Sequence, residues 1–108
     1  MSDAVSNMIG KTYTVHVAEV CIKVTVYKGA DGCPANIFCK ADGGWQGWVD
    51  SLIGTARIAM RHGTPLIEIL NHWRYQRFPP IGIAGQGCSI PDAIARRLIE
   101  EGYNKEEG

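Results

Sequence analysis

The segment from Arg74 to Asp92 holds the residues whose types and spacing are best suited to bind a ligand. Arg74 and Arg77 flank a tyrosine and precede Phe78, so guanidinium groups and aromatic rings alternate within a short stretch. Such flat groups stack on a purine ring and pair with phosphate oxygens. The competing interpretation is that Phe78 only continues the hydrophobic core. Both interpretations stay open, and binding of a flat anion is the functional one.

A glycine-rich turn follows, and it ends where a helix is expected to begin. Glycines let a ligand approach the backbone N–H groups of the turn, and the free N–H groups of a helix N-terminus favour anions. We therefore predict one ligand-binding site in this segment. Its residues are Arg74, Arg77, Phe78, Gly85, Gly87, Cys88, Ser89 and Asp92.

Cys88 and Asp92 are the candidates for catalysis. A thiol at a helix N-terminus can act as a nucleophile and a carboxylate as a general base. However, no histidine has a spacing that pairs it with Cys88, and an acid in the first helical turn is more often a cap. Cys33 and Cys39 lack the Cys-x-x-Cys spacing of a zinc site. We expect a non-enzymatic protein with no catalytic residue, no metal and no cofactor.

The charges are balanced over the chain but unevenly distributed. The 108 residues carry a formal net charge of zero. All six arginines lie between residues 51 and 99, where there are only two acids, so that part has a net charge of six minus two, or plus four. It is a candidate anion-binding surface, although arginines also commonly solvate helix faces. A neutral chain with an acidic end does not suit long nucleic acid.

The sequence shows no feature of export or membrane insertion. No apolar run approaches the roughly 20 residues that cross a bilayer, and the N-terminus lacks a basic flank followed by an apolar stretch. We expect a cytoplasmic protein that has no contact with a membrane. In that reducing compartment the four cysteines are expected to be thiols rather than disulfides.

The elements that would position the site follow from the hydrophobic periodicity. Alternation from Lys11 onward predicts three short strands, over 11–17, 20–27 and 35–40, with a turn at Asp31-Gly32. A three-stranded antiparallel meander needs a covering layer. We predict an α+β fold in which the meander packs against two to three C-terminal helices.

Helical periodicity from Trp45 to Met60 predicts the first of these helices, which ends at Gly63. Thr64 as N-cap and Pro65 as first helical residue predict the second. For the third helix, the expected N-cap is Ser89, with Asp92 completing a capping box and Gly102 ending the helix. The predicted domains are a flexible arm over 1–10, one domain over 11–102 and an acidic tail over 103–108.

The span from residue 22 to 101 resembles the TSCPD domain, which is found at the C-terminal end of many ribonucleotide reductases and in stand-alone bacterial and viral proteins. Three motifs carry the resemblance. They are the strands Lys23-Val24-Thr25-Val26 and Ile37-Phe38, the helix break His62-Gly63-Thr64-Pro65, and Cys88-Ser89-Ile90-Pro91-Asp92-Ala93-Ile94. The last aligns with Thr-Ser-Cys-Pro-Asp followed by Ala-Ile, the motif that names the family.

The departures from the family pattern bear on function. Ile90 stands where the family has a cysteine, Cys88 occupies the threonine position, and Phe78-Pro79 replaces an upstream Cys-Pro. A metal or thiol role of those cysteines is therefore not expected here. The chain also lacks the radical-bearing reductase barrel, so we expect no ribonucleotide reduction by this chain alone.

Two functional hypotheses remain open. The first is a binding protein that holds a small nucleotide or nucleotide-derived anion. In size and order of elements the chain resembles viral proteins that sequester such immune signals, including the Thoeris anti-defence proteins that trap cyclic ADP-ribose variants. The second is an interaction module that regulates a ribonucleotide reductase.

So small a domain has few walls to enclose a ligand, so we expect a homo-oligomer with sites between subunits. Trp45, Trp48 and Trp73 are the interface candidates, and at least two of the three are expected to be core residues.

Overall fold

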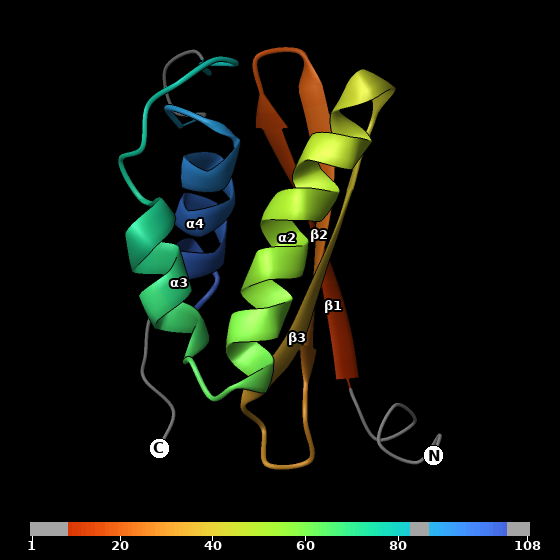
Figure 1. The fold of residues 1–108 in the computed structure, drawn as a ribbon, viewed down its shortest axis with the longest axis vertical. Helices are drawn as coiled ribbons and strands as arrows, with labels where there is room; N and C mark the ends of the chain where they lie inside the picture. The colour runs from red at the N-terminus through yellow and green to blue at the C-terminus, as the bar shows by residue number, and fades with distance from the viewer. Residues whose placement is uncertain (1–8, 83–86, 104–108) are drawn as a thin grey trace.

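The computed structural model describes residues 9–82 and 87–103. It contains a three-stranded antiparallel sheet in the order β1-β2-β3 and three helices, which confirms the predicted α+β fold (Figure 1). The strands are β1 (Ile9–Val17), β2 (Val20–Lys28) and β3 (Pro34–Ala41). A short 3-10 turn, η1 (Gly43–Trp45), leads into α2 (Gln46–Arg61), which is followed by α3 (Leu66–Trp73) and α4 (Ile90–Glu100).

The sheet has one buried face and one open face, as the alternation of apolar residues predicts. The fully buried side chains Val17, Ile22, Val24 and Ile37 come from all three strands and meet on the covered face. Their register is set by antiparallel pairs such as Val15 with Ile22. The open face carries hydroxyls, lysines and two aromatic rings.

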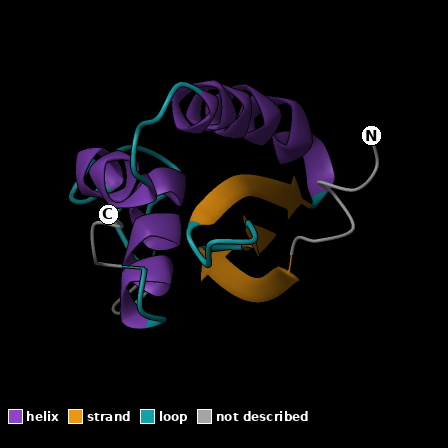
Figure 2. Ribbon diagram, turned by 90° about the horizontal axis from the view of Figure 1, so that it is seen from below, coloured by secondary structure: helices purple, strands orange, loops and turns teal. Residues whose placement is uncertain are grey.

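Two helices, α2 and α4, cover the buried face, and α3 lies on the outer side of α4 (Figure 2). α2 packs along β3, α4 lies against β1, and α3 packs on α4 rather than on the sheet. α3 nevertheless contributes buried residues to the core, among them Leu70 and Trp73. Its position on α4 brings the end of α3 next to the start of α4, where the predicted site lies.

Side chains occupy the outer edges of both edge strands. The Gln46 amide accepts from Ala41 N at 2.9 Å and donates to Cys39 O at 3.3 Å, as a neighbouring strand would. On the opposite edge, Arg97 donates to Thr14 O at 2.8 Å. These contacts pair two backbone groups of β3 and one of β1, so side chains cover part of each edge.

The structure places both ends of the domain differently from the sequence prediction. β1 begins at Ile9, inside the stretch assigned to a flexible arm over 1–10, because residues 9 and 10 pair with β2. Gly10 suits this pairing, since a Cβ there would lie 2.5 Å from the ring of Tyr27. At the other end, Tyr103 belongs to the fold and not to a tail: it is buried, and its hydroxyl is 3.0 Å from that of Tyr13. Residues 1–8 and 104–108 lie outside the described residues.

The helix ends were predicted largely correctly. Gly63 and Gly102 have the positive φ of +96° and +104° that ends a helix with a glycine. Ser89 caps α4, accepting from Asp92 N at 3.2 Å. At α3 the prediction was wrong by one residue: Pro65, not Thr64, is the N-cap, because it still has extended backbone angles.

We predict that Tyr103→Ala destabilises the fold by about 3 kcal/mol, because it removes a buried aromatic ring that packs edge-on against Tyr13. Tyr103→Phe keeps the ring and loses only the hydroxyl contact, and should cost about 1 kcal/mol. Urea denaturation monitored by tryptophan fluorescence measures both. Equal stability of Tyr103→Ala and the parent would show that the domain ends before this residue.

Candidate functional site

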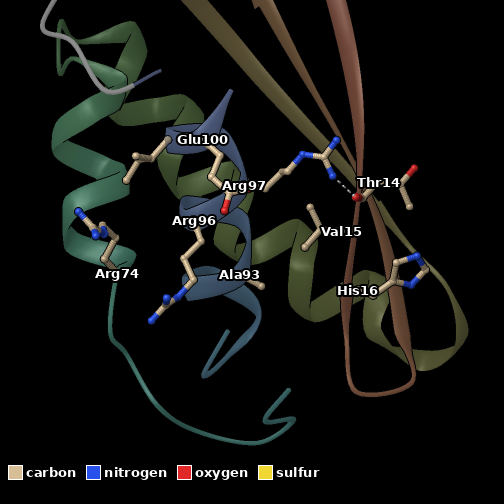
Figure 3. Close-up of a pocket in the computed structure, with 9 residues that line it drawn as sticks. Thr14, Val15, His16, Arg74, Ala93, Arg96, Arg97 and Glu100 are labelled. Atoms are coloured by element: carbon tan, nitrogen blue, oxygen red, sulfur yellow. Dashed lines mark hydrogen bonds between the residues drawn. The ribbon is translucent and has the colours of Figure 1, made fainter. Parts of the chain in front are cut away.

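A groove of about 580 Å³ lies between β1 and α4 and is lined by three arginines (Figure 3). α4 contributes one face to it, at the helical spacing of Ala93, Arg96, Arg97 and Glu100, and Arg74 reaches it from the end of α3. We call it the arginine groove. Its lining residues are Thr14, Val15, His16, Arg74, Ala93, Arg96, Arg97, Ile99 and Glu100.

The three arginines differ in how they are held. Arg97 points from α4 to β1, where it donates to Thr14 O, and its Nε also pairs with Glu101 at 2.9 Å (Figure 3). The Arg96 Nε pairs with Asp92 at 2.8 Å. Arg74 has no carboxylate partner among the described residues.

Among the side chains of residues 9–82 and 87–103, the Nε of Arg74 is the one buried nitrogen or oxygen without a hydrogen-bond partner. It is buried and makes no hydrogen bond within the described part of the chain. Buried donors are nearly always paired, and an unpaired one commonly marks a site for an ion or ligand. Arg74 therefore has an unused donor beside a groove that already contains two other guanidinium groups.

Asp92 is fully buried and joins three segments of the chain. Its Oδ1 accepts from Tyr75 N at 2.6 Å, and its Oδ2 accepts from Cys88 N at 2.7 Å and from Arg96 Nε at 2.8 Å. Both carboxylate oxygens are thus occupied by groups of this chain. Asp92 does not line the groove; it holds Arg96, which does.

The hydrogen bonds to Asp92 keep it ionised in spite of its burial. Burial alone would raise the pKa of Asp92, but the N–H groups of Cys88 and Tyr75 and the Arg96 guanidinium outweigh it and lower the pKa. The predicted capping box is only half formed, because Asp92 accepts from Cys88 N rather than from its own N-cap, Ser89. A carboxylate already saturated with donors is also a poor general base.

Tyr75 has an unusual conformation that Asp92 maintains. Its φ is +67°, a region that non-glycine residues rarely adopt, and its ring is 67% exposed. The guanidinium carbons of Arg74 and Arg96 lie 4.8 and 5.5 Å from the ring centre, and Arg74 donates to its hydroxyl at 2.7 Å. The ring thereby orders two of the three arginines of the groove.

The other predicted site residues lie around the loop between α3 and α4. Arg77 makes only a long contact, 3.9 Å, with the Cys88 sulfur. Phe78 does not stand in the arginine groove: its ring lies 5.9 Å from that of Trp48. Ser89 is buried and donates to Gln76 O at 2.7 Å.

The two predicted glycines have different outcomes. At Gly87, with φ +106°, a Cβ would lie 2.9 Å from the backbone of Ala93, so close packing explains this glycine. Gly85 falls outside the described residues. Of the seven predicted residues that the structure describes, only Arg74 lines the arginine groove.

Sequence reasoning missed Arg96 and Arg97 as site residues, and it used Tyr75 only as a neighbour of the arginines. One signal was readable: Asp92 and Arg96 have the i, i+4 spacing of an ion pair on a helix. The contact of Arg97 with Thr14 joins residues far apart in sequence, and local periodicity does not reveal it.

Three observations concern metal ligands and thiols in the described residues. No group of three or more His, Cys, Asp or Glu side chains is placed there to hold a metal ion. Ile90, in the position of the family cysteine, is fully buried. Burial also raises the pKa of the Cys39 thiol to about 12, which makes it unreactive at neutral pH.

Comparison with known proteins identifies the family. A family model described as the TSCPD domain matches residues 4–101, nearly the whole chain. No curated protein and no solved structure gives a significant match. Within the described residues, no helix combines the length and hydropathy that crossing a membrane requires.

We predict that Asp92→Asn destabilises the protein by about 3 kcal/mol at pH 7, because an amide cannot satisfy three converging donors. Since the pKa of Asp92 is lower in the folded than in the unfolded chain, its contribution is complete above the unfolded value of about 3.9 and is lost as pH falls through the folded value. The stability difference between parent and variant should therefore shrink on acidification, as measured by urea denaturation over a pH series.

Glu101→Gln is the matched control, since it neutralises the carboxylate of the largely exposed pair with Arg97. It should cost at most about 0.5 kcal/mol. If Asp92→Asn is as mild as this control, Asp92 is not the residue that joins the three segments.

Proposed function

Because the chain belongs to the TSCPD domain family, whose members are linked to ribonucleotide reductase-related proteins, we propose that it is a non-catalytic protein that binds nucleotide-type ligands. The ligand class is a small nucleotide or a nucleotide-derived anion, cyclic forms included. The observation that carries the proposal is the unpaired buried Nε of Arg74 beside Arg96 and Arg97.

The chemistry of the groove fits such a ligand. Guanidinium groups bind phosphate oxygens through paired N–H donors, and three of them line the groove. Arg96 and Arg97 each also pair with a carboxylate through Nε, whereas Arg74 has no carboxylate partner among the described residues. A volume of about 580 Å³ falls in the usual range for small-ligand pockets. Asp92 and Tyr75 hold two of the guanidinium groups in place before a ligand arrives, which reduces the entropy lost on binding.

Sequestration of a nucleotide-derived signal, as in viral anti-defence proteins, is the form of this function that we propose. A protein that only holds its ligand needs neither a nucleophile nor a base, and Asp92 and Cys39 are unsuited to those roles here. The second candidate is a regulatory module of a ribonucleotide reductase, which the family match favours. In that case the exposed loop residues would contact protein.

We predict that isothermal titration with a panel of linear and cyclic adenine nucleotides detects binding to the parent protein. Arg74→Gln should weaken it at least tenfold, because a hydrogen bond to a charged group is worth about that much or more. Tyr75→Gly should also weaken binding while preserving stability, since glycine accepts the φ of +67° without strain.

Lys23→Gln is the control. Lys23 lies opposite Thr14 in the sheet and does not line the groove, so this substitution removes one positive charge without changing the lining. Absence of heat with every nucleotide, together with co-purification with a reductase, would favour the regulatory module instead. Binding that is unaffected by Arg74→Gln and Tyr75→Gly would place the ligand elsewhere.

We also propose that the protein is a homo-oligomer. Trp73 is buried and Trp45 partly buried, which leaves Trp48, 40% exposed, as the remaining tryptophan for an interface. It lies beside the ring of Phe78, and two neighbouring aromatic rings favour assembly through this face.

We predict from light scattering a mass that is a multiple of the 11.8 kDa chain. Trp48→Glu should lower it, because a charge at an apolar contact opposes association. A monomeric parent protein would contradict the proposal. Ile58→Glu is the control, because Ile58 is an exposed apolar residue ten positions further along the same helix; it should leave the mass unchanged.

A further inference from the structure

A second groove lies where residues of α2 and β3 meet, and it contains two further arginines. Arg57 and Arg61 are one helical turn apart, and both are exposed. Neither has a carboxylate partner among the described residues. They line a groove of about 390 Å³ together with Ala35, Asn36, Gly54 and Ile58.

Arg57 is held in place although it is exposed. Its Nε donates to Asn36 Oδ1 at 3.1 Å, and its guanidinium carbon lies 4.1 Å from the centre of the Phe38 ring. The Phe38 ring is itself packed edge-on against Tyr27, with centres 5.6 Å apart. No hydrogen bond in the described structure uses the two terminal nitrogens of Arg57. An ordered guanidinium with free donors suits anion binding, because little side-chain entropy remains to be lost.

The surroundings of this groove have few acids. The three strands contain lysines and a histidine but no Asp or Glu. The one acid of α2, Asp50, accepts from Gln46 at 2.6 Å, and Asp31 in the turn before β3 accepts from Cys33 N at 3.0 Å. No carboxylate lines the groove, so its two guanidinium charges are not neutralised locally.

Gly54 gives the groove its room. Glycine inside a helix costs roughly 0.5 to 1 kcal/mol relative to alanine, and no packing explains it here, since a Cβ at this position would meet nothing within 4 Å. A side chain would instead extend into the space in front of Arg57 and Arg61. The glycine keeps that space open.

We propose that the groove between α2 and β3 is a second anion site that binds a phosphate group, with Arg57 and Arg61 as ligands and Asn36 as the residue that positions Arg57. Inorganic phosphate and the phosphate of a nucleotide share this chemistry. The site is separate from the arginine groove, and it does not depend on the function proposed for that groove.

The test is a titration of the full chain with inorganic phosphate, and in a second arm with adenosine monophosphate, followed by two-dimensional amide NMR. Shifts are expected at residues 35–38 and 54–61 in both arms. Arg57→Gln should weaken phosphate binding at least tenfold. Arg57→Lys should weaken it as well, because lysine keeps the charge but loses the planar fork held on Phe38 and Asn36.

Two further variants keep the proposal falsifiable. Lys40→Gln removes an equal charge from β3, the strand that carries Asn36, at a position outside the groove. It should change the affinity less than twofold. Gly54→Leu leaves both arginines in place and should be at least as stable as the parent, yet lose phosphate binding by filling the groove.

Four outcomes would overturn the second site. One is the absence of shifts at these residues with phosphate at tens of millimolar. Another is an equal effect of Arg57→Gln and Lys40→Gln, which would indicate general charge attraction. The third is undiminished binding to Gly54→Leu. Shifts confined to β1 and α4 would also overturn it, while they would support binding in the arginine groove.

Discussion

The structure around the arginine groove depends on one buried carboxylate. Asp92 pairs with a backbone donor at the end of α3, a backbone donor before α4 and a guanidinium one turn along α4. Burying a charge is costly unless it is paired and hydrogen-bonded. The buried carboxylate therefore requires all three of these donors. The same three bonds that keep the charge tolerable also fix where the chain leaves α3. The direction of Arg74 and the exposure of Tyr75 follow from that.

This arrangement explains why the family motif can lose its cysteine and keep its architecture. Ser89, Pro91 and Asp92 form the start of α4: Ser89 caps it, Pro91 suits the first turn, and Asp92 ties the preceding loop to it. Ile90 points into the core, where an apolar side chain fits as well as a thiol. The parts of the motif that hold the loop are thus retained, while the residue that could do redox chemistry is replaced.

The fold could be predicted from the sequence, because its signals are local. Alternating Tyr13, Val15 and Val17 mark a half-buried strand, and Gly63 and Gly102 mark helix ends. The candidate site could be predicted only in part. Arg74 was identified, but Asp92 was assigned to the ligand because its bond to Tyr75 joins residues 17 positions apart in the sequence. The bond of Arg97 to Thr14 spans 83 residues and comes from the packing of α4 on β1, which no short pattern encodes.

The six arginines of this neutral chain have two different physical roles. Arg96 and Arg97 pair with acids four residues away, and they hold α4 to the loop and to β1. Arg57, Arg61, Arg74 and Arg77 have no carboxylate partner within the described structure. Arg74 packs against the ring of Tyr75, and Arg57 packs against the ring of Phe38. The ring fixes the orientation of a guanidinium group whose charge no carboxylate of the described residues neutralises. Anion binding therefore depends on which arginines lack partners and on what orients them. Net charge, which is zero here, does not reveal it.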